Sequence, residues 1–149
     1  LRSALHRLKY KRDIGLGELF ARPMVKLLRQ LGWKIELVIP VPMTQKHLLQ
    51  RGYNQARLLS RPIAFALDLP HTDRGLHKVR ETSSQVHLSI AERAANVSGA
   101  FQAEPSLVKS KTILLVDDIM TTGSTLEACA HALRVGGAKS IYCLTLARA

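Results

Sequence analysis

The sequence predicts an α/β fold with a mostly parallel central sheet flanked by helices. Three apolar runs of strand length, at 35–41, 113–116 and 141–146, alternate with stretches that have helical spacing. The run at 113–116 is too short for a helix and apolar enough for a strand covered on both faces. We expect one domain of 149 residues, divided into a basic helical amino-terminal part, 1–34, and a core, 35–149.

Two helices are predicted before the first strand. A basic amphipathic helix opens the chain, with leucines at helical spacing up to Leu8. Spaced leucines over 16–31 predict a second helix, interrupted or restarted near Pro23 and ended at Gly32. The glycine pair at 15–17 follows no predicted strand and lacks a third glycine, so it does not predict a dinucleotide site.

Two helices are predicted between the first two strands. The segment Tyr53–Leu67 has helical character, with a kink or break expected at Pro62. A capping box at Ser89–Glu92 opens a short helix that runs to Val97. These helices complete the alternation of strand and helix that favours a parallel sheet, with a functional site beyond the carboxyl ends of the strands.

The most informative stretch is Thr112–Thr125, TILLVDDIMTTGST. A strand ends at paired aspartates, and after Leu126 apolar residues recur with helical spacing until Gly136. Backbone N–H groups, hydroxyls and the positive helix end converge in the loop between them, which suits a phosphate dianion. The predicted 5-phosphate ligands are Thr121, Thr122, Gly123, Ser124 and Thr125.

The residues around this loop narrow the class of phosphate compound. A nucleotide-binding Walker loop needs a lysine after its last glycine, and here Gly123 is followed by Ser124-Thr125. Carboxylates just before a phosphate loop indicate a ligand with hydroxyls or a metal beside its phosphate, and a ribose 5-phosphate fits. The structural alternative is a strand–turn–helix unit in which Asp117 or Asp118 only makes an Asx turn.

This string resembles the phosphoribosyl pyrophosphate (PRPP) motif of type I phosphoribosyltransferases. With LHRLKYKRD near the start, PVPMTQKHLLQRGYNQA at 40–56 and RETSSQVHLSIAERAANVSGAF at 80–101, the chain resembles the competence protein F (ComF) family. Members of that family commonly begin with a cysteine-rich, zinc-ribbon-like segment. This chain begins at Leu1 and has no Cys-x-x-Cys spacing, so we expect a fragment or a truncated member.

The resemblance implies that the core at 35–149 binds PRPP with magnesium and transfers or binds a phosphoribosyl group. It places Asp117 and Asp118 at the ribose hydroxyls, and either one is a candidate magnesium ligand, since magnesium takes few protein ligands beside substrate phosphates. Adjacent strand residues point to opposite faces, so both reach one ligand only if the chain turns at Asp117; Asp117 is therefore favoured. Arg80 is the third catalytic candidate.

The resemblance places a diphosphate loop directly after the first strand. The predicted loop residues are Val41, Pro42 and Met43, and Lys46 and Arg51 are candidates to supply positive charge. The alternative for these two cations is a solvated surface position. Shortly after them, Asn54 and Gln55 either cap the next helix or orient the diphosphate loop, and the sequence leaves that choice open.

The polar, aperiodic stretch Lys78–Leu88 predicts a mobile lid that closes over PRPP. Arg80 is the preferred lid cation and Lys78 the second. The residues assigned to this lid are Lys78, Arg80, Ser83 and Gln85.

The net charge of +11 is concentrated in the first part of the chain. Residues 1–60 hold 12 basic and 3 acidic side chains, a balance of +9. A polyanion is therefore predicted to meet this part, and single-stranded DNA bound through residues 2–12 is the candidate beside PRPP; a solvated basic helix face is the alternative. No apolar run is long enough to cross a membrane, and a cytoplasmic location is predicted.

Three classes of function therefore stay open. The first is a PRPP-dependent transferase, the second is a PRPP or nucleotide sensor without chemistry, and the third is an accessory protein that handles single-stranded DNA. The acceptor substrate is not predictable, because no aromatic cluster indicates a base-binding pocket.

Overall fold

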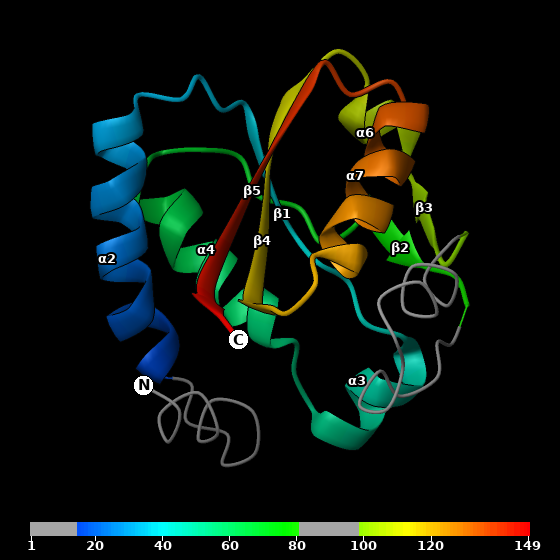
Figure 1. The fold of residues 1–149 in the computed structure, drawn as a ribbon, viewed down its shortest axis with the longest axis horizontal. Helices are drawn as coiled ribbons and strands as arrows, with labels where there is room; N and C mark the ends of the chain where they lie inside the picture. Colours follow the sequence, from blue (N-terminus) through cyan, green and yellow to red (C-terminus); the bar gives the residue numbers. More distant parts are fainter. Residues whose placement is uncertain (1–14, 81–98) are drawn as a thin grey trace.

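The computed structural model describes residues 15–80 and 99–149 of the chain. Within these ranges the strands and helices form a parallel sheet with helices on both faces, and a small antiparallel strand pair beside it (Figure 1). In chain order the elements are α2 (Gly15–Leu31), β1 (Leu37–Pro40), α3 (Gln45–Arg51), α4 (Gln55–Ala66), β2 (Leu76–Lys78), β3 (Phe101–Ala103), α6 (Pro105–Val108), β4 (Thr112–Met120), α7 (Ser124–Val135) and β5 (Ser140–Arg148).

The parallel sheet has the strand order β1-β4-β5, with β4 paired to both neighbours. This arrangement confirms the predicted fold class. All three predicted apolar runs form strands, and β4 and β5 extend beyond the predicted ends. The chain after α4 adds a short parallel bridge at the free edge of β1, where His71 is the partner of Val38.

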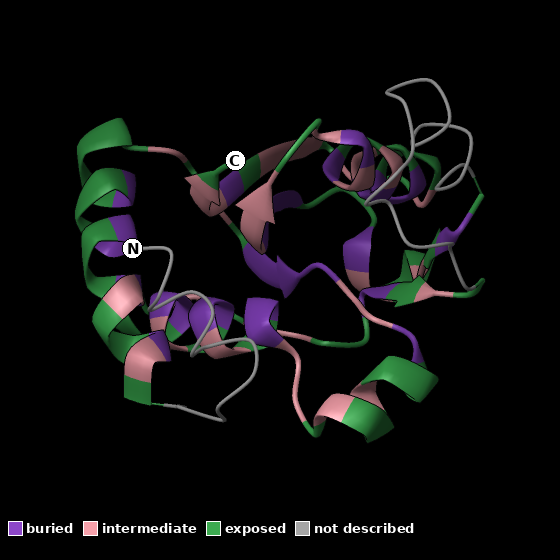
Figure 2. Cartoon of the chain, turned by 60° about the horizontal axis from the view of Figure 1, so that its bottom comes forward, coloured by how far each residue is buried: buried purple, intermediate pink, exposed green. Residues whose placement is uncertain are grey.

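Alternate residues of β4 face two different helix layers. Ile113 and Leu115 pack in a cluster with α7 and the β2–β3 pair. Leu114 and Val116 pack in a second cluster with α2 and α4. All four side chains are fully buried, which confirms the prediction of a strand covered on both faces. Buried residues accordingly follow the strands and the sides of the helices that face them (Figure 2).

The helices α2 and α4 continue through their prolines, which corrects the predicted interruption at Pro23 and excludes a break at Pro62, while a kink at Pro62 stays a prediction. A proline removes one helical hydrogen bond, but Pro23 is exposed and Pro62 half-buried, so neither ring displaces the core. Buried side chains on each side of these prolines hold the helices against the sheet, and this packing outweighs the local cost.

The helices α2 and α4 are in close contact where Pro62 has freed a carbonyl. Pro62 has no N–H to donate to the Leu58 carbonyl, four residues earlier. Gly17 of α2 lies against that carbonyl, and a Cβ added to Gly17 would lie 2.6 Å from the Leu58 oxygen. The second glycine of the 15–17 pair is therefore a helix-packing residue, in agreement with the absence of a dinucleotide motif.

Several short elements were not predicted. They are α3, which buries no side chain, α6, and the pair β2–β3, with three residues in each strand. The predicted helices at 1–12 and 89–97 lie outside the described residues. Across 15–80 and 99–149, the structure contains no helix that is long and apolar enough to span a membrane.

Candidate functional site

The candidate site lies at the edge of the sheet where the parallel strands β1 and β4 end (Figure 1). The Val41 amide donates to the Val116 carbonyl at 2.8 Å, so the two strands stay paired up to this edge. The loop after β1 leads to α3, and the loop after β4 leads to α7. The predicted diphosphate and 5-phosphate loops therefore emerge from neighbouring strands, as ligand loops do in open parallel sheets.

The loop before α7 has an open helix N-terminus. Gly123 is the N-cap of α7, with φ 88° in the left-handed region, and no side chain caps the helix. The Ser124 amide donates to Thr122 Oγ1 at 3.4 Å, and the other N–H groups of the first turn of α7 suit an anionic ligand. The hydroxyls of Thr122 and Ser124 lie 2.9 Å apart, with Ser124 buried and Thr122 exposed. Gly123 is needed here because an L-residue is strained at this φ.

The two aspartates do not meet the geometric condition set by the sequence. β4 runs straight through them, with Asp117 opposite Thr145 of β5, so the chain has not turned at Asp117. The alternation of β4 continues, which places Asp117 on the same side as Leu115 and α7, and Asp118 on the α2–α4 side. Both carboxylates accept a hydrogen bond from the next backbone amide at 2.9 Å.

The electrostatics agree with this placement of Asp117. Burial, and secondly the negative charge of Asp117, raise the pKa of the Cys129 thiol on α7 well above its usual value. Asp117 is therefore the aspartate on the side of the 5-phosphate loop. Carboxylate oxygens suit magnesium, which takes one or two protein carboxylates beside substrate phosphates, so Asp117 fits as a ligand of that ion. Among residues 15–80 and 99–149, no three His, Cys, Asp or Glu side chains gather to hold a metal.

The diphosphate side of the edge is held by a residue whose role the sequence left open. Asn54 Oδ1 accepts from the Ala56 amide at 3.0 Å and caps α4, while Asn54 Nδ2 donates to the Val41 carbonyl at 3.0 Å. Asn54 thus caps α4 and also holds Val41, the first residue of the loop that is predicted to bind a diphosphate. Gln55 does neither; its side chain is buried, and within the described residues its Nε2 has no hydrogen-bond partner.

The predicted diphosphate cations lie on or near α3. Thr44 caps this helix, with its Oγ1 accepting from the His47 amide at 3.4 Å. Lys46 is exposed in the first turn, and Arg51 is half-buried in the last turn. The loop residues Pro42 and Met43 are half-buried, and their predicted contact with a diphosphate stays a prediction.

The first residue of the predicted lid belongs to a strand, and the lid itself stays a prediction. Lys78 belongs to β2, opposite Phe101 of β3, and its Nζ lies 5.8 Å from the centre of the Phe101 ring. Lys78 is therefore a strand residue with a cation–π contact, not a loop residue. Arg80 follows the strand and is exposed. Ser83 and Gln85 lie outside the described residues.

The parallel sheet and the glycine loop between β4 and α7 describe a class of protein, and comparison with known proteins gives its family. The model of the phosphoribosyl transferase domain matches residues 48–149, and the chain belongs to this family. Competence protein F of Haemophilus influenzae is 40% identical over 120 residues, which are 76% of this chain and 51% of that protein. DNA utilization protein YhgH of Salmonella typhimurium is 31% identical over 149 residues, 97% of this chain and 65% of that protein.

These relatives confirm the resemblance to the competence protein F family. The chain spans 51% and 65% of the length of the two relatives, respectively. Solved structures agree on the fold alone. Glutamine PRPP amidotransferase from B. subtilis, complexed with ADP and GMP, gives a TM-score of 0.57 at 22% identity over 89% of this chain and 25% of that one. Adenine phosphoribosyltransferase from Thermoanaerobacter pseudethanolicus gives 0.56 at 15% identity over 93% and 84%.

Proposed function

We propose that this domain binds PRPP with magnesium at the carboxyl edge of the sheet and transfers its phosphoribosyl group. The observation that carries the proposal is the N-terminus of α7, where the N-cap Gly123 is left-handed and has no capping side chain, after a strand that carries Asp117 and Asp118. The phosphoribosyl transferase domain match and the similar folds support it. The names of competence protein F and YhgH refer to competence and DNA utilization and not to phosphoribosyl transfer. Transfer is therefore proposed in addition to PRPP binding and needs its own test.

The residues divide the work of holding PRPP. The 121–125 loop holds the 5-phosphate through backbone N–H groups and hydroxyls, a neutral cradle that uses the positive end of α7. Asp117 holds the ribose hydroxyls and the magnesium that accompanies the diphosphate. The 41–43 loop, fixed to α4 by Asn54, receives the diphosphate. Magnesium would neutralise the charge of the leaving diphosphate. Hydrogen-bond donors that the fold already holds in place need no rearrangement while that charge develops.

Calorimetric titration tests the binding part of this proposal. PRPP, pyrophosphate and ribose 5-phosphate are titrated separately, with magnesium and with EDTA. We expect PRPP to bind most tightly, ribose 5-phosphate to bind without a need for magnesium, and pyrophosphate to depend on it. Absence of PRPP binding in magnesium would overturn the proposal.

A second measurement separates a transferase from a sensor. A transferase releases pyrophosphate from PRPP when an acceptor is supplied, and an Asp117→Asn variant should lose that release. A sensor binds PRPP with the same magnesium dependence and releases no pyrophosphate with any acceptor. Competitive binding of nucleoside monophosphates then identifies which acceptor bases to try first.

A second candidate function is the handling of single-stranded DNA. The names of the two relatives and the balance of +9 in residues 1–60 favour it. The predicted contact region, residues 2–12, lies outside the described residues. Anisotropy of a labelled oligothymidine, measured with the parent and with Lys9, Lys11 and Arg12 changed to glutamine, tests that region. Absence of oligothymidine binding at low salt would overturn this second function.

The cytoplasmic location of the protein stays a prediction.

A further inference from the structure

The outer face of the α2–α4 layer carries a groove of about 1480 Å³ that neither the phosphate loop nor its aspartates line. Its two walls are the helices themselves, and its far end is formed by the turn that joins α3 to α4. The sheet lies beneath this layer, and α7 covers the opposite face of the sheet (Figure 1). The groove is thus a second concave surface, separate from the phosphate loop.

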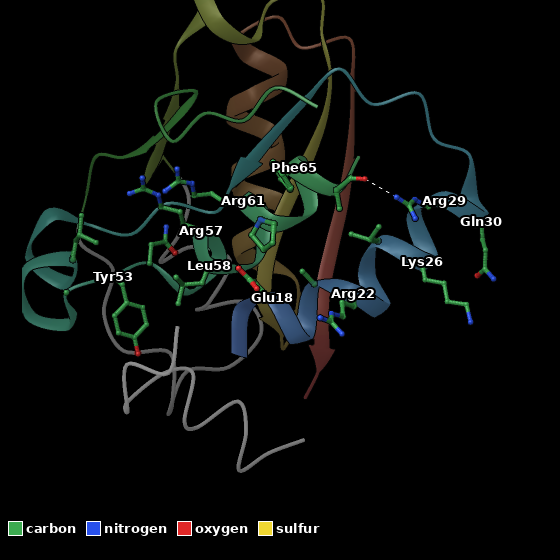
Figure 3. Close-up of a pocket in the computed structure, with 17 residues that line it drawn as sticks. Glu18, Arg22, Lys26, Arg29, Gln30, Tyr53, Arg57, Leu58, Arg61 and Phe65 are labelled. Carbon is green, nitrogen blue, oxygen red and sulfur yellow. Dashed lines mark hydrogen bonds between the residues drawn. The ribbon is translucent and has the colours of Figure 1, made fainter. Parts of the chain in front are cut away.

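The walls of this groove are strongly basic. Arg22, Lys26 and Arg29 line it from α2, and Arg57 and Arg61 line it from α4 (Figure 3). Glu18 is the one acidic residue among its lining residues. The cations recur at helical spacing on each helix, which places them in a row along each wall. Packing of α2 against α4 then brings the two rows to one surface.

Most of this charge is not neutralised by the described part of the protein. Arg57 pairs with Asp73 at 2.9 Å, and Arg29 donates to the Ala66 carbonyl at 3.0 Å. Within residues 15–80 and 99–149, no carboxylate lies within ion-pair distance of Arg22, Lys26 or Arg61. These three exposed side chains are therefore available to an anion. They give the groove at least three positive charges that no described carboxylate neutralises.

The surface between the cations is apolar and partly aromatic. Leu58 and Pro62 lie half-buried between the two rows of charges. Phe65 follows one turn later on α4, with 90% of its surface exposed, and Tyr53 stands at the other end of the same helix (Figure 3). Alternating cations and flat apolar groups suit a chain that presents phosphates on one side and bases on the other.

We propose that this groove binds single-stranded nucleic acid, with the phosphates on the arginine and lysine rows and bases against Phe65. The proposal rests on the second function above and assigns it a site that is distinct from residues 2–12. Charge complementarity decides the occupant. A second copy of this chain carries a net charge of +11, and residues 1–12 are themselves basic, so both repel the groove.

The test compares two neutralised variants that change the net charge equally. One carries Arg22→Gln, Lys26→Gln and Arg61→Gln in the groove. The control carries Lys109→Gln, Lys111→Gln and Lys139→Gln, three exposed cations away from the groove. Fluorescence anisotropy of fluorescein-labelled oligothymidine is measured over a range of salt concentrations, and circular dichroism verifies that each variant is folded.

The groove variant should lose about two units from the slope of log affinity against log salt, since each lost phosphate contact removes about 0.7 for a single strand. Its affinity at low salt should fall roughly tenfold or more, while the control stays within about threefold. Phe65→Ala should weaken binding about fivefold or more with an unchanged slope, because stacking releases no counterions. PRPP affinity should stay the same in all of these variants.

Four results would overturn the groove. Equal losses of oligothymidine affinity in the groove variant and its control would mean that binding depends only on the overall charge of the protein. A loss confined to Lys9→Gln, Lys11→Gln and Arg12→Gln would keep the second function and move its site to residues 2–12. Competition by polyglutamate at the same charge concentration as oligothymidine would assign the groove to an acidic polypeptide. Failure of the parent to bind oligothymidine would overturn the second function and the groove together.

Discussion

The carboxyl edge of the sheet and the α2–α4 groove attract phosphate by two different physical means. At the edge, one left-handed glycine begins α7, the 121–125 loop has no charged side chain, and the strand before it carries two aspartates. In the groove, five cations and one acidic residue line a surface that is formed mainly by two helices. Geometry at the edge selects one phosphate in one position, whereas charge in the groove favours any chain of phosphates.

The largest expected effect is a difference in PRPP affinity between substitutions at the two ends of the helix α7. Gly123 (φ 88°) and Gly137 (φ 91°) both have left-handed backbone, so valine at either position is strained. Gly123→Val should lower PRPP affinity roughly ten- to a hundredfold, as expected when a charge-assisted contact of about 1.5–3 kcal/mol is lost. Gly137→Val lies beyond the other end of α7 and should leave PRPP affinity unchanged.

Calorimetry with PRPP and thermal unfolding of both variants measure this comparison. A similar loss of stability in both variants, with PRPP affinity lowered by Gly123→Val alone, assigns the phosphate to the 121–125 loop. Equal PRPP affinity for the folded Gly123→Val variant and the parent would contradict that assignment. Oligothymidine binding should be the same for both variants, because the groove takes no residue from α7.

A second prediction concerns the packing that forms the groove. Gly17→Ala would place a Cβ 2.6 Å from the Leu58 carbonyl oxygen, which is backbone and cannot move aside without shifting α4. We expect a loss of about 1–3 kcal/mol in the free energy of unfolding, the usual cost of overpacking a tight contact. Gly15→Ala, at an exposed position in the first turn of the same helix, serves as the control and should be neutral or stabilising.

Urea unfolding of the two alanine variants gives both free energies. An unchanged free energy for Gly17→Ala would mean that the helices separate at no cost. PRPP affinity of the folded Gly17→Ala protein should match the parent, since Gly17 touches the helix layer and not the edge of the sheet.

A third prediction tests the link between α4 and the diphosphate loop. Asn54→Ser retains a side chain that caps helices well but removes the Nδ2 that donates to the Val41 carbonyl. One neutral hydrogen bond contributes about 0.5–1.5 kcal/mol, so PRPP and pyrophosphate affinity should fall roughly two- to tenfold. Ribose 5-phosphate affinity should not change, because that ligand has no diphosphate.

Asn54→Ala provides the comparison, since it removes the cap as well as the donor. It should show the same loss of pyrophosphate affinity, and its free energy of unfolding should also fall by about 1 kcal/mol. If Asn54→Ser weakens ribose 5-phosphate as much as pyrophosphate, Asn54 does not act through the diphosphate loop.

The local patterns predicted the parts of the fold that are decided locally. The apolar run before Asp117 predicted β4, and the glycines after Val135 predicted the end of α7, because strand burial and left-handed caps leave direct traces in sequence. α3 was missed because it buries no side chain and therefore has no apolar stripe. Thr44 and Gly52, which cap its two ends, were the signals that could have revealed it.

The parts that depend on contacts between distant segments were not predictable in the same way. The prolines were read as helix breakers, but whether a proline faces solvent depends on which side of the helix packs. The charge balance of residues 1–60 predicted a polyanion site, and its placement at 2–12 stays a prediction, but the sequence did not indicate a second basic surface with Arg22 and Arg61. These two side chains share a groove only because α2 packs on α4. Asn54 could be assigned only once Val41 was located beside it.

The smallest expected effect is a pH dependence beside the groove. His71 accepts or donates a hydrogen bond with the Ser60 hydroxyl at 2.8 Å and lies 4.0 Å from Asp73. Burial lowers the pKa of His71 below 6.5; Asp73 opposes this, and the charges of Arg61 and Arg57 add to it. Below pH 6.5 the unfolded chain therefore binds more protons at this histidine than the folded chain does.

Stability should consequently be fully present above about pH 6.5 and fall as the pH drops through the window below that value. His71→Gln should flatten the dependence of stability on pH between about pH 7 and pH 5, measured by thermal or urea unfolding. The carboxylates Glu36 and Glu104 do not titrate in this range, because their pKa values lie below 4.5. Oligothymidine in the groove should oppose the charges of Arg57 and Arg61, raise the pKa of His71 and flatten the curve as well. PRPP should leave the slope unchanged, since its predicted ligands do not include His71 or the groove arginines. An equal flattening by both ligands would contradict the separation of edge and groove, because one bound phosphate compound would then act on both regions.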